Sequence, residues 1–206
     1  MNNQNNDVIN QQIEIFKSAL KDRSQTEHFI VQKYITHGTP YIFKDNEDLY
    51  FDLKYEIANE FELKSPEMVR MVGSAKLGFS ISPKKVWQHF SEDKSDIDMV
   101  IISRSIFEDF WTELYDFNID LTYRDKKEQQ NYDKFKNYFF KGWLRPDLFP
   151  FSFRKRNEWF DFFKSISYKK YGQQKIAGAI YYDFSFFEKY HIKNIHNLRK
   201  EMIKDV

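Results

Sequence analysis

The chain has 206 residues and a mass of 25.2 kDa, which suits one domain of ordinary size. Apolar residues make up 41% of it and aromatic residues 19%, and the formal net charge is +1; this composition supplies a packed core and excludes long-range disorder. Cysteine is absent and no apolar run is long enough to span a bilayer, which excludes disulfides, thiolate metal sites and a membrane partner. Because the start of the chain lacks a signal-peptide pattern, we expect a cytoplasmic protein.

In chain order, the spacing of apolar residues predicts three helices before the first strand. They cover residues 8–21, 24–35 and 46–61. Ser24 is the expected N-cap of the second helix, because Glu27 follows three residues later in a capping-box pattern. These helices make up a helical N-terminal part, residues 8–61, within a single domain that covers residues 1–206.

Later segments alternate between strand and helix patterns. The predicted strands are 68–72, 97–102 and 175–182, and the predicted helices are 105–117, 157–168 and 184–204. Residues 97–102 are almost all apolar and rich in β-branched side chains, as expected for a central strand covered on both faces. The polar stretch 125–137 is expected to be exposed, and 142–153 to be irregular. The predicted fold class is therefore α+β (α/β), a mixed sheet flanked by helices with helical additions at both ends.

The net charge hides an asymmetry between two parts of the chain. Residues 1–140 carry 18 Lys and Arg against 24 Asp and Glu, whereas the C-terminal part, residues 141–206, carries 14 against 7. Arg154 begins an Arg-Lys-Arg run within this basic part. Such a run attracts phosphate groups or forms a solvated helix face, and the sequence leaves both interpretations open. Arg145 is a further candidate contact for a phosphate or an acceptor.

Two carboxylates stand at the head of the predicted central strand. Asp96 and Asp98 are two residues apart, so their side chains face the same side of a strand. Carboxylates held side by side repel each other, and a divalent cation relieves that repulsion. Hard cations such as Mg²⁺ take carboxylate oxygens together with substrate phosphates. The alternative is a turn or cap in which both side chains are solvated.

A Gly-Ser pair follows the first predicted strand. Gly73 permits a tight turn and a close approach of the backbone to an anion, and the Ser74 hydroxyl adds a hydrogen-bond donor. Lys76 would place a cation near a phosphate. The segment is not a Walker A loop, because the Gly-Lys-Ser/Thr ending is missing. A strand-to-helix turn without a ligand is the alternative interpretation.

Together, the apolar strand ending in Gly-Ser, the intervening helix and the Asp-x-Asp strand resemble the nucleotidyltransferase fold of the DNA polymerase beta superfamily. The resemblance covers residues 66–103. It implies that Gly73 and Ser74 hold the phosphates of a nucleoside triphosphate. It also implies that Asp96 and Asp98 are catalytic and bind Mg²⁺ or Mn²⁺.

Beyond this core, the resemblance implies further groups at the site. Lys76 and Ser95 would add to nucleotide binding. In that superfamily a third carboxylate on a later strand completes the catalytic site. Asp183, which ends the last predicted strand, is the first candidate here, ahead of Asp120 and Glu188.

The implied reaction is Mg²⁺-dependent transfer of a nucleoside monophosphate from a nucleoside triphosphate to an acceptor hydroxyl of RNA, protein or a small molecule. Positioning and charge stabilisation would supply most of the catalysis. The chain also looks like small nucleotidyltransferase-like proteins of bacteria and their mobile elements, which points to bacterial defence or a toxin–antitoxin pair. Two alternatives stay open: a catalytically inactive module that binds or senses a nucleotide, and an RNA-binding protein that uses the basic C-terminal part.

Overall fold

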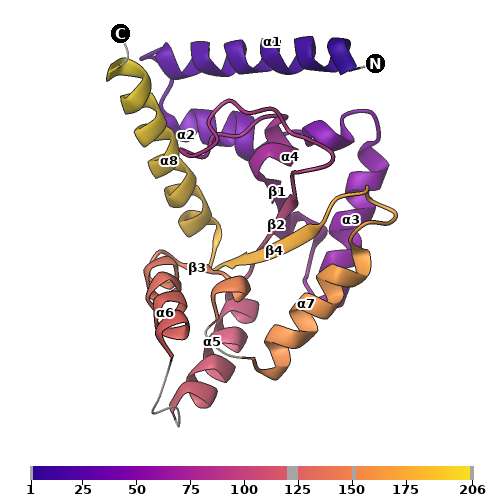
Figure 1. Ribbon diagram of the computed structural model, residues 1–206, viewed down its shortest axis with the longest axis vertical. Helices are drawn as coiled ribbons and strands as arrows, with labels where there is room; N and C mark the ends of the chain where they lie inside the picture. The colour runs from indigo at the N-terminus through magenta and orange to yellow at the C-terminus, as the bar shows by residue number, and fades with distance from the viewer. Residues whose placement is uncertain (1, 120–124, 150–151, 205–206) are drawn as a thin grey trace.

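The computed structural model describes residues 2–119, 125–149 and 152–204 and shows a mixed α+β fold (Figure 1). The elements are, in chain order, α1 (Asn2–Lys21), α2 (Glu27–Ile30), η1 (Val31–Thr36), η2 (Tyr41–Phe43), α3 (Glu47–Glu60), η3 (Pro66–Met68), β1 (Val69–Val72), α4 (Gly73–Leu77), β2 (Ile97–Ile102), α5 (Arg104–Ile119), α6 (Lys126–Phe139), β3 (Trp143–Leu144), η4 (Pro146–Leu148), α7 (Arg154–Ile166), β4 (Ile176–Tyr181) and α8 (Phe184–Lys204). None of the described helices has both the length and the apolar character that crossing a membrane requires.

Four strands form one mixed sheet in the order β1-β2-β4-β3. β1 is antiparallel to β2, β2 is parallel to β4, and β3 is antiparallel to β4. The predicted central strand is therefore confirmed: β2 has a partner on each side, and Asp98 is the one residue of this strand that is not buried. The register places Asp98 level with Val72 of β1 and with Ala177 of β4.

Helices cover both faces of this sheet (Figure 1). On one face α3, α5 and α7 pack over a core that includes Met99 of β2 and Trp159 of α7. On the other, α1, α2 and α8 share a second core with Val100 of β2 and Phe187 of α8. Side chains alternate along a strand, so Asp98 points to the same face as Val100. The predicted carboxylate pair therefore opens toward the layer that contains α8.

The start of the second predicted helix needs a correction. Ser24 is not its N-cap, because the Oγ1 of Thr26 accepts the hydrogen bond from the Phe29 N–H at 3.1 Å. The helix therefore begins at Glu27 and continues as the π-helical segment η1. Two neighbouring hydroxyl residues compete for the same cap, and only the geometry of the turn decides between them.

Residues 125–137 are largely exposed, as predicted, and they form most of the helix α6. The Asp125 carboxylate accepts a hydrogen bond from the Glu128 N–H at 2.8 Å, and the Glu128 carboxylate accepts one from the Asp125 N–H at 2.9 Å. This reciprocal pair is a capping box. Phe135 anchors the helix in the core. A strongly polar segment is thus helical because its first turn is capped and one aromatic side chain is buried.

Candidate functional site

The Asp98 carboxylate lies directly against the backbone of Gly73. A Cβ atom built on Gly73 would stand 2.9 Å from Asp98 Oδ2, and Gly73 has a φ of +73°. The antiparallel register causes this approach, since Val72 pairs with Asp98 and the next residue turns into α4. Only glycine meets both demands at this position, a left-handed backbone and no side chain. The structure thus brings the Gly-Ser turn and the second aspartate together.

The ionised form of Asp98 is poorly stabilised. Its side chain reaches water through the mouth of a cleft, yet protein atoms surround it. Although Asp98 is exposed as a residue, nearby protein atoms displace water from its carboxylate; this desolvation, followed by repulsion from Asp96, raises the pKa of Asp98 to about 6, against the opposing effect of Arg145 and Lys175. Asp96 is exposed as well, and its Oδ2 lies 4.0 Å from the Lys175 Nζ. Two carboxylates and two cationic side chains therefore lie at the end of the sheet where β2 and β4 begin.

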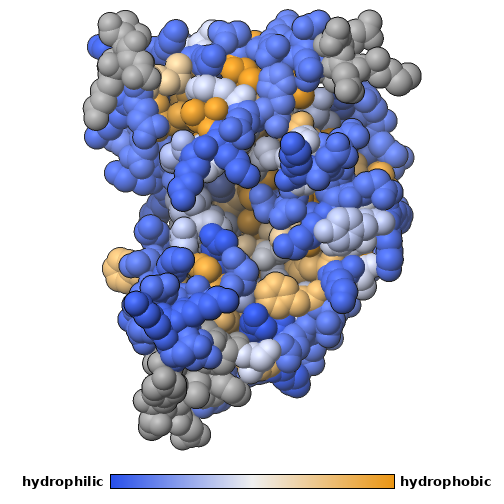
Figure 2. Space-filling model, viewed as in Figure 1, coloured by the Kyte–Doolittle hydropathy of each residue, from blue (hydrophilic) through white to orange (hydrophobic). Residues whose placement is uncertain are grey.

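The cleft that holds these groups has a volume of about 1120 Å³, and the space-filling view shows the molecule hollowed near the middle of its face (Figure 2). It is lined by the turn residues Gly73 and Ser74, by Ser95, Asp96 and Asp98, and by Arg145, Asp147 and Lys175. The residues 177–179 in the middle of β4 are Ala-Gly-Ala and only half-buried. Ala177 and Ala179, on the same face as Asp98, thus leave room above the sheet for a ligand, whereas Gly178 faces α7 and packs against Phe163 and Trp159.

The ammonium group of Lys76 is held away from the carboxylates. It is buried and donates hydrogen bonds to the backbone carbonyl oxygens of His37, at 2.6 Å, and of Gly38. Burial lowers the pKa of Lys76 to about 8. This lysine, expected to contact a phosphate, instead ties α4 to the loop after η1. Lys76 and Ser95 both line the cleft, and the Ser95 Oγ accepts a hydrogen bond from the Ser91 N–H at 3.1 Å.

Asp183 does not reach the site, which corrects the expected third carboxylate. β2 and β4 are parallel, so Asp98 stands level with Ala177 at the start of β4, whereas Asp183 follows its end. The two positions are roughly 20 Å apart along the strand. Among the described residues, β4 therefore presents no carboxylate beside Asp98.

Hydrogen bonds show what Asp183 does instead. Its Oδ1 accepts hydrogen bonds from the backbone N–H groups of Ser185, at 2.9 Å, and Phe186, at 3.2 Å, and its Oδ2 accepts one from Arg104 at 2.9 Å. Partial burial raises the pKa of Asp183, but Arg104 and Ser185 outweigh it and hold that pKa at about 2. Asp183 therefore caps the start of α8.

Of the other two candidates for a third carboxylate, one makes its contacts away from the cleft and one is untested. Glu188 forms its contacts with His28, at 3.1 Å, and Gln32, at 3.3 Å, on the α2–η1 side of α8. Asp120 lies outside the described residues.

Asp147 is the acidic residue in the cleft that sequence reasoning missed. β3 is antiparallel to β4, with Leu144 level with Ile180, so the chain after β3 runs back toward the end of the sheet that holds Asp98. Asp147 lines the cleft there, and its negative charge acts on Asp98. Arg145 donates hydrogen bonds to both of its oxygens, at 3.1 Å and 2.7 Å. The signal in the sequence was the Arg-Pro-Asp run, of which only the arginine attracted attention.

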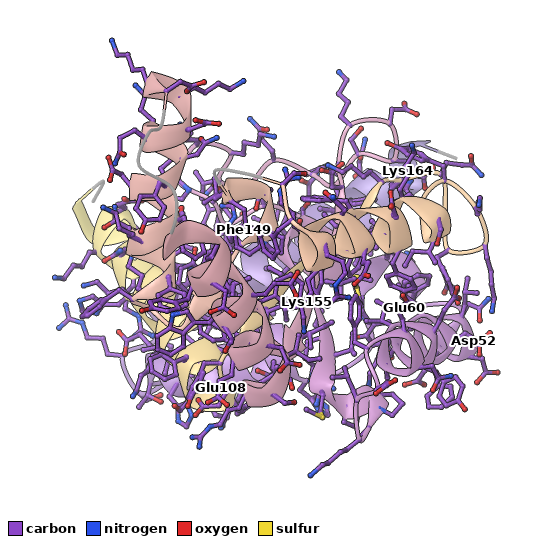
Figure 3. All side chains as sticks on the ribbon, turned by 90° about the horizontal axis from the view of Figure 1, so that it is seen from below. Asp52, Glu60, Glu108, Phe149, Lys155 and Lys164 are labelled. Carbon is purple, nitrogen blue, oxygen red and sulfur yellow. The ribbon has the colours of Figure 1, made fainter. Side chains whose placement is uncertain are left out.

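The basic run at the start of α7 is largely paired with acidic residues. Arg154 lies 3.2 Å from Glu113, and Lys155 lies 3.6 Å from Asp109, both on α5. These contacts favour a solvated helix face over a phosphate site at this end of α7. Lys155 and Lys164 lie near the two ends of the helix (Figure 3), and it is Lys164 that lines the cleft.

No family model, no curated protein and no solved structure matches this chain. Within the described residues, no group of three or more His, Asp or Glu side chains is arranged to hold a metal ion by itself. A cation at Asp96 and Asp98 would therefore depend on ligands from a substrate or from water, which is the usual situation for Mg²⁺.

Proposed function

We propose that the cleft binds a nucleoside triphosphate together with a divalent cation and transfers the nucleoside monophosphate to an acceptor hydroxyl. The observation that carries this proposal is the contact between the Gly73 backbone and the Asp98 carboxylate at the mouth of the cleft. We infer further that β1, α4 and β2, with β4 alongside, form the nucleotidyltransferase arrangement that the sequence motif resembles. Residues that line one cleft support both proposals.

The residues present fit a hard cation. Asp96 and Asp98 supply carboxylate oxygens on one face of β2, and Gly73 leaves the space beside Asp98 Oδ2 free of a side chain. Mg²⁺ or Mn²⁺ is commonly held by one or two carboxylates, with substrate phosphates and water completing the shell. Bound there, the cation would neutralise phosphate oxygens and stabilise the charge that develops during transfer.

The chain's own side chains would carry the remaining steps. Arg145 and Lys175 offer positive charge that attracts the triphosphate into the cleft. Asp147, oriented by Arg145, takes the proton of the acceptor hydroxyl. The hydroxyl oxygen forms the new bond to the α-phosphorus, the bond from that phosphorus to the bridging oxygen breaks, and pyrophosphate leaves with the bonding electrons.

One observation favours a second candidate, a module that binds a nucleotide without transferring it. β4 carries Ala177 at the position level with Asp98, and both Asp147 oxygens are already engaged by Arg145. Such a module would bind a nucleoside triphosphate in the presence of Mg²⁺ and release no pyrophosphate.

The test is incubation with each of the four α-labelled nucleoside triphosphates, Mg²⁺, total bacterial RNA and lysate protein. The wild type is compared with the Asp96→Ala/Asp98→Ala variant and with Asp93→Ala, an exposed carboxylate nearby that does not line the cleft. We expect label transfer by the wild type and by Asp93→Ala, and a loss of about a hundredfold or more in the double variant.

The labelled species then names the acceptor class. Mg²⁺-dependent binding without transfer would favour the binding module. Absence of both binding and transfer would overturn the proposal. RNA affinity that falls with salt and survives loss of both aspartates would identify an RNA-binding protein instead.

A further inference from the structure

The cleft continues beyond the carboxylates toward the far end of β4. There it is bounded by a set of side chains that we call the inner chamber: Trp143 of β3, Ala179 of β4, and Tyr190, His191 and Asn194 of α8. In Figure 1, α8 rises from the end of β4 to the upper end of the molecule, and three of its residues line this space. The chamber thus has one wall of strand residues and one wall of helix residues.

His191 is buried in this chamber without a hydrogen-bond partner. Its side chain is 8% exposed, and neither ring nitrogen has a partner among the described residues. Its neighbours are the rings of Phe187, at 4.6 Å between centroids, and of Tyr190, at 5.3 Å. Burial lowers the pKa of His191 to about 4, so the imidazole is neutral near pH 7. A neutral imidazole has one donor and one acceptor, and leaving both unused in the interior is costly.

Trp143, on the wall formed by strand residues, also has a buried polar atom without a hydrogen-bond partner in the described part of the chain. Its indole N–H is buried and has no partner among the described residues. The ring is fixed by stacking on Tyr181, with centroids 5.5 Å apart and planes 8° apart, and by an edge contact with Tyr190 at 4.5 Å. The chamber therefore holds unused polar groups from two elements, which the surrounding aromatic rings close off from water, so a ligand reaches them only when one of these rings turns aside.

Such a chamber is suited to a flat, uncharged ring that has donors and acceptors on its edge. The position level with Asp98 is Ala177, and His191 packs on Tyr181, four residues further along β4. The separation is about 13 Å along the strand. Between the two ends, the cleft is lined by the small side chains of Ala177 and Ala179, which share the face of Asp98. A nucleotide with its phosphates at Asp98 would have its base near the chamber.

We propose that the inner chamber binds the purine or pyrimidine base of a nucleoside, with His191 and Trp143 as hydrogen-bonding partners of its edge. The link to the phosphate end of the cleft rests on the proposed function. The chamber itself does not depend on it, because a free nucleoside has no phosphate and needs neither Asp96 nor Asp98.

The test uses His191→Phe, which keeps a ring of similar size and removes both nitrogens. Binding is measured by calorimetry for Mg²⁺ with inorganic tripolyphosphate, for Mg²⁺ with each of the four nucleoside triphosphates, and for the four free nucleosides. His196→Phe is the matched control, because His196 lies on the same helix, contacts Glu27 and does not line the cleft. His191→Leu serves if the phenyl ring is too large for the space.

We expect the wild type to bind at least one nucleoside triphosphate about tenfold more tightly than tripolyphosphate, and His191→Phe to lose most of that preference. Tripolyphosphate affinity should stay unchanged in both variants. A merely structural histidine would not produce this split, since the variant loses no hydrogen bond within the protein.

The outcomes separate the two proposals. Tripolyphosphate binding with no preference for any base, or a preference that His191→Phe retains, overturns the chamber and leaves the proposed function standing. Nucleoside binding that His191→Phe weakens, without tripolyphosphate binding, supports the chamber and overturns the phosphate site. No binding of any probe overturns both.

Discussion

Gly73 and Asp98 occupy a shared space with no room for a methyl group. The pairing of β1 with β2 delivers Gly73 to the carboxylate, and a φ of +73° turns its backbone toward Asp98 Oδ2. A side chain here would push on the carboxylate that we propose as a cation ligand. The contact therefore links the local geometry of the turn to the function that we propose for the cleft.

We expect Gly73→Ala to abolish Mg²⁺-dependent binding of nucleoside triphosphates or to weaken it at least about tenfold, because a shift of even 1 Å at a reacting site is costly. The left-handed backbone should also lower the free energy of unfolding by about 1–2 kcal/mol. Calorimetry for binding and urea unfolding for stability measure the two effects.

Gly38→Ala is the control for this prediction. Gly38 has a φ of +75°, and a Cβ atom there would meet nothing within 4 Å. It should therefore lose a similar free energy of unfolding and retain nucleotide binding. Equal binding by both variants would show that the contact with Asp98 does not matter.

Asp147 and Asp183 should respond in opposite ways to the same substitution. Asp147→Ala should retain Mg²⁺-dependent nucleotide binding and lose about a hundredfold in transfer rate, because the proposed proton acceptor is gone. Asp183→Ala should leave transfer unchanged and lower the free energy of unfolding by about 1 kcal/mol, the usual cost of losing an N-cap. Labelled transfer and urea unfolding measure these effects. A transfer defect in Asp183→Ala would restore it as the third carboxylate.

The sequence allowed the central strand and the position of the aspartates at its head to be predicted, because both depend on local pattern. The apolar run 97–102 has the same bounds as β2, and the helix predicted over 184–204 has the same bounds as α8. The two aspartates at the start of this strand and the turn at Gly73 and Ser74 could be identified from residue types alone. Strand periodicity and turn chemistry act over a few residues, which is why they can be read without the fold.

The presence of Asp147 in the cleft could not be predicted, because it depends on how distant strands pair. A parallel β4 puts its start, not its end, beside Asp98, and this direction decides against Asp183. Asp147 enters the cleft only because a strand of two residues, β3, pairs antiparallel with β4. Likewise, the sequence shows His191 only as one of several histidines, since its burial and its lack of partners come from packing.

Lys76 and Lys94 test whether a lysine near the motif is structural or binds phosphate. Lys76→Met should lower the free energy of unfolding by about 2 kcal/mol, because the carbonyl oxygens of His37 and Gly38 lose a charged donor. Its affinity for tripolyphosphate and Mg²⁺ should not change. Lys94→Met, at an exposed position that lines the cleft, should keep its stability and lose affinity a few-fold. If Lys76→Met instead kept its stability and lost affinity for tripolyphosphate, Lys76 would be assigned to the phosphate site.

His191 should make the protein less stable in mild acid. Its pKa is about 4 in the folded protein, against 6.5 as the ordinary value, so between these pH values the unfolded chain binds more protons. The stability that neutral His191 permits is complete above about pH 6.5 and is lost as the pH falls toward 4. For the wild type this loss amounts to about 2 kcal/mol at pH 5.

His191→Phe removes that titration. Relative to the wild type, its free energy of unfolding should therefore be higher at pH 5 than at pH 7.5 by about that amount. Urea unfolding of both proteins at the two pH values measures the difference, with His196→Phe as the control on an exposed histidine. A variant that gains no more at pH 5 than at pH 7.5 would mean that a proton reaches His191 in the folded state, and the neutral donor–acceptor pair assigned to the chamber would be wrong.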